Sequence, residues 1–187
     1  MPDPALHAAL VDGPEPVLVT LSEYDPAWPA RFTARAAELR TLLGERARLV
    51  EHVGSTSVPG LAAKPIVDIV VGIDDPDDEP AYLPDLLAAG YRLRVRQHAH
   101  RVLRTGDPGE QVNVHCYPPA HPEVRRFLLF RDRLRSDEPD RSRYEAVKRS
   151  LSGREWPDVN VYAEAKRPVI EEILARAGWP DQRASGS

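Results

Sequence analysis

An apolar, β-branched run at residues 65–71 contains one carboxylate, Asp68. An ionised carboxylate within such a strand is costly to desolvate unless a cation or strong hydrogen-bond donors face it. A loop rich in Gly, Ser and Pro, residues 54–64, precedes this run, and a shorter apolar strand, residues 48–53, precedes the loop. The chain therefore has to fold so that Asp68 meets polar partners, and the loop is the nearest source of them.

The loop carries groups that suit a phosphorylated ligand. Gly54 permits unusual backbone angles and a close approach of other groups. Ser55 and Thr56 carry hydroxyls, and Lys64 is a compact positive charge. With a carboxylate on the following strand, this pattern is typical of a phosphate held beside a divalent cation. The structural alternative is a tight connection capped by Ser or Thr, with the carboxylate paired to a lysine or an arginine.

The sequence H-V-G-S-T-S-V-P-G-L-A-A-K-P-I-V-D-I, residues 52–69, resembles the signature of the GrpB family, which is related to the nucleotidyltransferase superfamily. The resemblance covers about residues 17–175 and continues through V-N-V-H-C-Y (112–117), F-R-D-R-L-R (130–135), Y-E-A-V-K-R-S-L (144–151) and Y-A-E-A-K (162–166). In that superfamily a Gly-Ser pair is followed by a strand reading Asp-x-Asp. Here the second carboxylate position is Val70, so the two-metal form of the chemistry lacks a ligand.

The resemblance implies an α+β fold: a nucleotidyltransferase-like mixed sheet with flanking helices and a helical C-terminal third. It further implies that the protein binds a nucleoside triphosphate with Mg²⁺ and transfers a nucleotidyl group to an unknown small acceptor. Asp68 would be the catalytic residue and a metal ligand, with His115 and Glu51 as further metal candidates. The other expected binding residues are Gly54, Ser55, Thr56, Lys64, Asn113, His115, Arg131, Tyr144, Lys148, Tyr162 and Lys166.

Two other functions remain open at this point. The first is a non-catalytic accessory or regulatory module that binds a nucleotide or another phosphorylated ligand and has lost the second metal carboxylate. Members of the family also occur fused to dephospho-CoA kinase, so the resemblance suggests a link to coenzyme A metabolism. The second is a metal-dependent hydrolase in which His98, His100 and His115 join Asp68 around zinc, although their spacing matches no recognised zinc motif.

The later motifs have structural interpretations as well. Arg131 belongs to a helical segment, and Lys148 and Lys166 each follow a tyrosine at a spacing of four, so these cations would form one wall of a phosphate site. Ordinary surface ion pairs, such as Asp132 with Arg135, explain similar spacings. We expect Trp28, Trp156 and Cys116 to be packing residues in the core.

Hydrophobic periodicity gives the order of the elements. Strands are expected at 17–21, 48–53, 65–71, 91–96, 100–105 and 111–117, and helices at 27–43, 81–89, 121–135, 140–151 and 161–177. Asp25 is the expected N-cap of the first helix and Pro26 its first residue, while Pro168 marks a kink or break in the last helix. We predict one domain over 17–177, a flexible arm at 1–16 and a frayed tail at 178–187.

Composition narrows the partners and the compartment. The formal net charge of −4 argues against broad nucleic-acid binding, which depends on neutralising phosphates. One cysteine, Cys116, excludes an intramolecular disulfide and fits a reducing compartment. No apolar run reaches the length of a membrane span, so we expect a cytoplasmic protein without a membrane partner. Nothing in the motifs indicates an organic redox cofactor.

Overall fold

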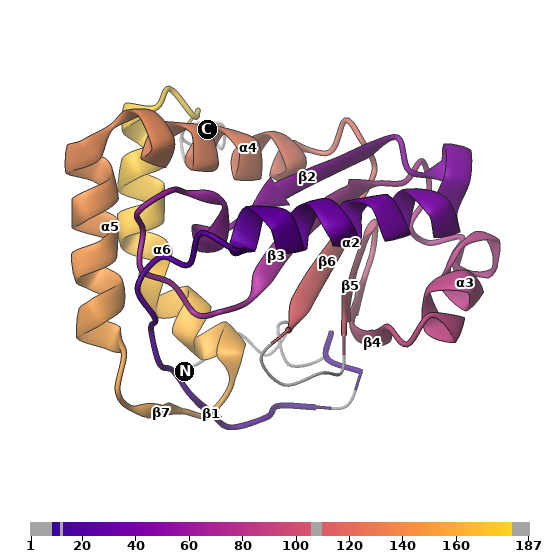
Figure 1. Ribbon diagram of the computed structural model, residues 1–187, viewed down its shortest axis with the longest axis horizontal. Helices are drawn as coiled ribbons and strands as arrows, with labels where there is room; N and C mark the ends of the chain where they lie inside the picture. Colours follow the sequence, from indigo (N-terminus) through magenta and orange to yellow (C-terminus); the bar gives the residue numbers. More distant parts are fainter. Residues whose placement is uncertain (1–8, 12, 106–109, 181–187) are drawn as a thin grey trace, which may run out of the picture.

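A five-stranded mixed sheet forms the centre of the protein (Figure 1). The computed structural model describes residues 9–11, 13–105 and 110–180. In spatial order the strands are β2 (Leu49–Val53), β3 (Val67–Gly72), β6 (Val112–Tyr117), β5 (His100–Arg104) and β4 (Arg92–Gln97). β3 and β6 pair in parallel, and the other neighbours pair antiparallel. A separate two-stranded sheet joins β1 (Val17–Leu18) to β7 (Glu155–Trp156).

Helices cover both faces of the large sheet, as Figure 1 shows. One face is packed against α2 (Trp28–Leu43) and the short α3 (Leu83–Ala88). The C-terminal third is helical, with α4 (Pro122–Ser136), α5 (Glu138–Leu151) and α6 (Val159–Arg176) on the other side and at one end. Short 3₁₀ turns lie at Gly44–Arg46, Ser55–Ser57 and Glu79–Ala81. The predicted α+β class, the mixed sheet and the helical C-terminal third are confirmed.

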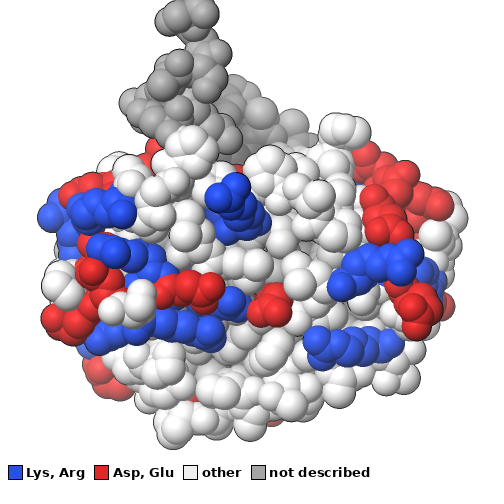
Figure 2. Space-filling model, turned by 90° about the horizontal axis from the view of Figure 1, so that it is seen from above, with Lys and Arg blue, Asp and Glu red and all other residues white. Residues whose placement is uncertain are grey.

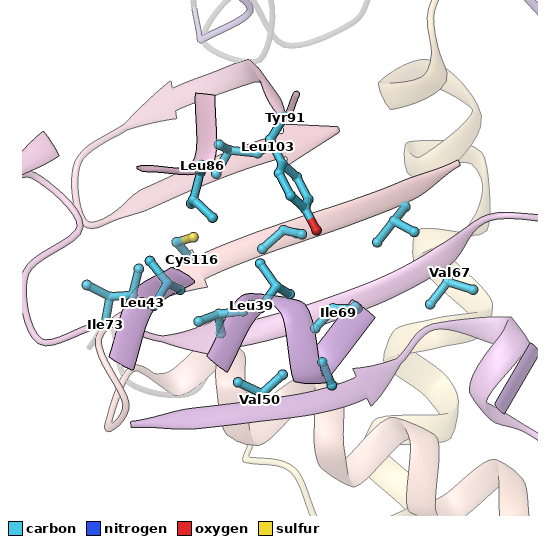
Figure 3. Close-up of a cluster of buried hydrophobic side chains, with 14 of the residues drawn as sticks. Leu39, Leu43, Val50, Val67, Ile69, Ile73, Leu86, Tyr91, Leu103 and Cys116 are labelled. Carbon is cyan, nitrogen blue, oxygen red and sulfur yellow. The ribbon is translucent and has the colours of Figure 1, made fainter. Parts of the chain in front are cut away.

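The main core lies between α2, α3 and the sheet (Figure 3). Leu39 and Leu43 of α2 are buried against strand residues that include Ile69 and Leu103. Successive residues of a strand point to opposite faces, so Val67, Ile69 and Val71 enter this core while Asp68 and Val70 face the C-terminal helices. The alternation of the strand therefore decides that the carboxylate projects toward α4 and α6.

The expected packing residues are also in place. Trp28 and Trp156 are buried, and Cys116 is buried within the core, where burial raises the pKa of its thiol to about 12. The face of the molecule seen in Figure 2 carries Lys and Arg side chains next to Asp and Glu side chains. One of the expected surface ion pairs, Arg135 with Asp132, has a separation of 3.8 Å.

Some predicted boundaries are wrong. α2 begins at Trp28, with Ala27 at the N-cap position. Asp25 Oδ1 instead accepts a hydrogen bond from the Ala27 backbone N–H at 2.8 Å, so it stabilises the turn before the helix. Pro168 lies inside α6, which continues through it without a break.

Parts of both termini are described. Within the predicted arm, Leu10 forms a bridge to Val95 at the β4 edge, and the Val11 backbone N–H donates to the Arg94 carbonyl at 3.1 Å. Residues 1–8 and 12 of the arm, and 181–187 of the tail, lie outside the described residues. Across the described ranges, no helix combines the length and hydropathy needed to cross a membrane.

The core predicts a difference between two leucines of neighbouring helices. Leu39→Ala removes a fully buried side chain, so we expect it to lower the free energy of unfolding by about 2–5 kcal/mol. Leu87→Ala, on the exposed side of α3, should change it by less than about 0.5 kcal/mol because 47% of Leu87 is already exposed. Urea unfolding of both variants measures the difference, and equal effects would contradict the described core.

Candidate functional site

The strand register places Asp68 within a polar row that crosses the sheet. Asp68 pairs with Asn113 of β6, and Asn113 pairs with Arg104 of β5, so the three side chains lie on one face. Asn113 Nδ2 donates to Asp68 Oδ1 at 2.8 Å, and Arg104 Nε donates to Asn113 Oδ1 at 3.0 Å. His115 Nε2 lies 3.7 Å from the same Asp68 oxygen. The half-buried carboxylate of the strand therefore has donors that compensate its partial desolvation.

These partners keep Asp68 ionised. Burial alone would raise the pKa of its carboxyl group. The nearby His115 side chain, the hydrogen bond from the amide of Asn113 and the charge of Lys166 outweigh burial, and the pKa of Asp68 lies below its ordinary value. At neutral pH the site therefore contains a fixed negative charge that can accept a proton or a hydrogen bond.

Gly54 allows the loop backbone to approach that carboxylate. Gly54 has φ +69°, in the left-handed region that favours glycine. A Cβ atom added to Gly54 would lie only 2.5 Å from Asp68 Oδ2. No other residue fits without moving Asp68, so the glycine of the Gly-Ser pair is needed for the position of the carboxylate.

The rest of the loop is held by buried hydrogen bonds. His52 Nε2 and Thr56 Oγ1 are 3.1 Å apart, and the Thr56 hydroxyl donates to the Ile66 carbonyl at 3.1 Å. Burial lowers the pKa of His52 to about 4, so the imidazole is neutral and donates from Nε2 to Thr56. Thr56 is only 1% exposed, and its hydroxyl stabilises the loop. The sequence predicted that Thr56 binds the ligand, but it does not line the cavity described below.

Two arginines of α4 bind the end of β2 and the loop that follows it. Arg131 Nη1 donates to Glu51 Oε2 at 2.8 Å and to the His52 carbonyl at 3.0 Å. Arg135 donates through Nε and Nη2 to the Ser57 carbonyl, at 3.0 and 2.8 Å. Arg131 was expected to bind phosphate and Glu51 to bind a metal ion. In the structure the two side chains form an ion pair with each other. Glu51 is opposite Val70 in the strand register, two pairs away from Asp68.

Several of the predicted residues meet in one small cavity of about 160 Å³, which we call the lysine cavity. Its walls are Ser55, Lys64, Ile66, Asp68, Asn113, Lys148, Val159, Tyr162, Ala163 and Lys166. These residues come from the loop, two strands, α5 and α6, which are far apart in the sequence. Tertiary structure has therefore combined one carboxylate, two hydroxyl-bearing side chains and three lysines around a single volume.

The three lysines of this cavity are arranged around aromatic rings. Lys166 Nζ lies 4.4 Å, and Lys64 Nζ 5.7 Å, from the centre of the Tyr162 ring. Lys148 Nζ is 4.9 Å from the Tyr144 ring centre and donates to the Ala62 carbonyl. Tyr144 itself lies in the core beneath, against Phe130, and does not line the cavity.

The lysine cavity carries more positive than negative charge, with three lysines and one carboxylate in its wall. Within the described part of the chain, Lys64, Lys148 and Lys166 form no ion pair with a carboxylate. Burial, then the neighbouring charge of Lys166, lowers the pKa of Lys148 to about 7, and burial also lowers the pKa of Lys64. These cations are ready to bind an anion, because a negative ligand would relieve both their desolvation and their mutual repulsion.

A second cavity of about 510 Å³, the wide cavity, opens on the other side of Asp68. It shares Lys64, Ile66, Asp68, Asn113, Val159 and Ala163 with the lysine cavity. The wide cavity is also lined by His115, Arg94 and Arg104, none of which lines the lysine cavity. Part of its wall is the N-terminal segment that includes Leu10 and Glu15.

Arg104 and Asp158 were missed by the sequence analysis. Asp158 is the N-cap of α6 and accepts a hydrogen bond from the Asn160 backbone N–H at 2.7 Å. An aspartate directly before a helix is a common N-cap, so the sequence could have revealed this role. Arg104 was detectable only through strand alternation, since His100, Val102 and Arg104 share a face. Its place beside Asn113 follows from strand pairing, which the sequence did not reveal.

The histidines do not form the zinc site that was considered. His98 is 95% exposed at its side chain and pairs with Asp77 at 2.7 Å, while His100 stacks on Tyr117 with ring centres 4.1 Å apart. Across residues 9–11, 13–105 and 110–180, no three His, Cys, Asp or Glu residues gather as metal ligands. Asp68 with His115 is therefore too small a donor set for a structural zinc ion.

A magnesium ion is a different case, because Mg²⁺ is often held by one or two carboxylates while ligand phosphates and water complete its shell. The donor set here supplies one carboxylate, Asp68, whose Oδ1 already accepts from Asn113. It fits one Mg²⁺ shared with a phosphate and does not fit a pair of metal ions, because Val70 packs with Val53 and Val124 and Glu51 is bound by Arg131.

The fold and the site together define an α+β protein whose lysine cavity sets one strand carboxylate among three cations. The GrpB protein family matches residues 18–176, and the chain belongs to this family. It is 50% identical over 169 residues to the UPF0157 protein SCO7215 of Streptomyces coelicolor, covering 90% of this chain and 89% of that protein. It is also 34% identical to a dephospho-CoA kinase of Mycolicibacterium paratuberculosis, covering 87% of this chain but 47% of that protein.

Solved structures are similar as well. The crystal structure of the conserved protein GrpB from Enterococcus faecalis matches with a TM-score of 0.70 and 30% identity, over 84% of this chain and 96% of that chain. The Cid1 poly(U) polymerase with bound MgGTP matches with a TM-score of 0.42 and 14% identity, over 63% of this chain and 43% of that chain. The first comparison agrees with the family; the second carries no argument about the site.

The contact between Gly54 and Asp68 predicts a specific loss of stability. Gly60 also has a positive φ, of +77°, but a Cβ there would meet nothing within 4 Å. Gly60→Ala should therefore cost only the backbone penalty of about 1–2 kcal/mol, whereas Gly54→Ala should cost more because it displaces the carboxylate. Chemical unfolding of both variants tests this, and an Asp68→Ala background should reduce the extra cost of Gly54→Ala. Equal losses at both glycines would contradict the contact.

The buried Lys148 predicts a pH dependence of stability. Its folded pKa of about 7 is below the ordinary 10.5, so the unfolded chain binds more protons between these values. The contribution of Lys148 to the unfolding free energy should therefore fall as pH decreases from about 10.5 to about 7. Lys148→Met should remove this slope, which thermal unfolding across that pH range measures. An unchanged slope would contradict the burial of the charge.

Proposed function

We propose that the lysine cavity binds the triphosphate of a nucleotide and that the protein transfers the nucleotidyl group to a small acceptor. The observation that carries this proposal is the convergence of Lys64, Lys148 and Lys166 on one cavity with Asp68 at its boundary. Polyphosphates carry enough negative charge to compensate several lysines at once, whereas a single carboxylate does not. Ser55 lies on the same wall, and its hydroxyl would donate a further hydrogen bond to a phosphate oxygen.

Asp68 would position the attacking group in this reaction. The acceptor hydroxyl oxygen forms a bond to the α-phosphorus, the bond from that phosphorus to the bridging oxygen breaks, and pyrophosphate leaves. The hydroxyl proton passes to the ionised Asp68 and then to water. A bound Mg²⁺, held by Asp68 and phosphate oxygens, would supply charge neutralisation at the phosphates.

Lys148 is placed to stabilise the leaving group, pyrophosphate. It is 2% exposed, and its pKa of about 7 places it near half protonation at neutral pH. A bound polyphosphate would favour its charged form, so binding should take up a proton. The protonated lysine, with Lys64 and Lys166, then stabilises the negative charge that develops on pyrophosphate.

A non-catalytic binding protein is the second candidate, and the pairing of Glu51 with Arg131 favours it. Position 70, where the second metal carboxylate is expected, is a valine. Glu51 lies opposite Val70 in the sheet, but its carboxylate is bound by Arg131 and is therefore not available to a metal ion. A site with lysines and one carboxylate still binds phosphates. Because relatives include proteins named dephospho-CoA kinase, a phosphorylated ligand or partner from coenzyme A metabolism is proposed for this alternative.

Ligand-induced thermal stabilisation separates these candidates. The melting temperature is measured with ATP, GTP, CTP or UTP, each with and without Mg²⁺. We expect at least one of these nucleotides to stabilise the wild type by about 2.7 kcal/mol at a hundredfold excess over Kd. For a chain of this size that is a shift of about 5–11 °C in Tm. Asp68→Asn should abolish the Mg²⁺-dependent part and Lys166→Met should weaken binding of every nucleotide. The control Asp78→Asn, at an exposed carboxylate, should leave the shifts unchanged.

The outcomes are distinct. A shift that needs no Mg²⁺ and survives Asp68→Asn would favour the non-catalytic candidate. A Mg²⁺-dependent shift together with slow release of pyrophosphate that Asp68→Asn abolishes would support the transferase. If no nucleotide shifts the Tm of the wild type, nucleotide binding is wrong in both forms.

A further inference from the structure

We propose that the wide cavity is an acceptor site that selects a small hydroxyl compound bearing a carboxylate or phosphate group, with Arg104 as the anchor for that group. The assignment of the compound as an acceptor rests on the proposed function. The binding of a small anion beside Arg104 does not, because it follows from the wide cavity itself.

Arg104 has unused donors that point to an anionic ligand. Its Nε donates to Asn113 Oδ1, which fixes one edge of the guanidinium group. Within the described residues its two terminal nitrogens donate no hydrogen bond, and no carboxylate lies within ion-pair distance. A guanidinium group with free terminal nitrogens binds a carboxylate or phosphate with two parallel hydrogen bonds. A partly buried arginine in this state is costly unless such a ligand arrives.

The nearby acidic residues are already occupied. Glu15 Oε2 lies 3.1 Å from Arg94 Nη2, so this carboxylate has a partner of its own. Asp158 accepts from the Asn160 backbone N–H at 2.7 Å and from the Glu15 backbone N–H at 3.2 Å. Their hydrogen bonds are therefore made to other donors, and within the described residues the terminal nitrogens of Arg104 remain open to a ligand of the wide cavity, which Lys64 also lines.

The geometry of the wide cavity also explains why the proposed ligand should carry a hydroxyl group. Arg104, Asn113 and Asp68 form one row across the sheet, so a ligand held at Arg104 extends over Asn113 toward the Asp68 carboxylate. The wide cavity shares Asp68 with the lysine cavity, where the triphosphate is proposed to bind. A short molecule with its anionic group at Arg104 would present a hydroxyl at the boundary of the two cavities. Val95, Val102 and other apolar side chains line the wide cavity and would contact the carbon skeleton of the molecule.

Three related probes test this assignment. Glycerate and glycerol 3-phosphate carry the anionic group as a carboxylate or a phosphate ester, and glycerol is the neutral match. Binding is measured by calorimetric titration of the full chain, alone and with saturating MgATP. At least one anionic probe should bind the wild type, and glycerol should not. Arg104→Gln should weaken that probe at least tenfold, while Arg125→Gln, at an exposed arginine of α4, should leave it unchanged.

A further variant distinguishes the two cavities. Small anions can also bind the lysine cavity, so Lys166→Met is titrated with the same probes. Retained binding in Lys166→Met and lost binding in Arg104→Gln would assign the probe to the wide cavity. The reverse pattern would overturn the proposal, as would equal binding to wild type and Arg104→Gln, or no binding of either anionic probe at 10 mM, roughly the weak limit for such small ligands.

This design keeps the failure of the two proposals apart. Nucleotide shifts of Tm are measured on Arg104→Gln in parallel. If these shifts persist while the anionic probe is lost, the variant is folded and its lysine cavity is intact. If no nucleotide binds but the probe depends on Arg104, the anion site stands and only its role as an acceptor site is lost.

Discussion

The site depends on the need to satisfy one carboxylate in a buried strand. Asp68 faces the C-terminal helices because alternate residues of β3 fill the core on the other face. Its partners come from outside the strand: an amide on β6, an imidazole two residues further on, and a loop backbone that only glycine brings so close. The costly placement of a charge thus explains why loop, strand and neighbouring strand occupy their positions.

The basic residues divide into two roles. Arginines of α4 are used to build the site, since Arg131 binds the His52 carbonyl of β2 and Arg135 binds the Ser57 carbonyl of the loop. A planar guanidinium group with several donors is suited to binding fixed carbonyls and carboxylates. Lysines face the cavity instead, with Lys64 and Lys166 beside the Tyr162 ring. Their single charged atoms remain available to a ligand, which is why the lysines, and not Arg131, carry the proposed function.

Much of the fold was predictable, because local patterns determine local structure. The strand alternation around Asp68 and the helical spacing of Lys148 and Lys166 predicted the right elements, and several of the predicted residues line one cavity. Thr56 was assigned to the nucleotide and Glu51 to a metal ion, yet Thr56 forms hydrogen bonds within the loop and Glu51 forms an ion pair with Arg131. Polar residues near a site look alike in sequence whether they bind a ligand or support the loop.

The sequence by itself determined that a carboxylate, a Gly-Ser loop and an apolar strand occur in succession, because spacing and side-chain type are properties of the chain. Only the tertiary structure decided which distant groups share the cavities. The pairing of β5 with β6 set Arg104 beside Asn113, and the packing of α5 and α6 brought Lys148 and Lys166 together. Strand pairing and helix packing depend on the burial of the whole core, so these neighbours follow from contacts that no local segment contains.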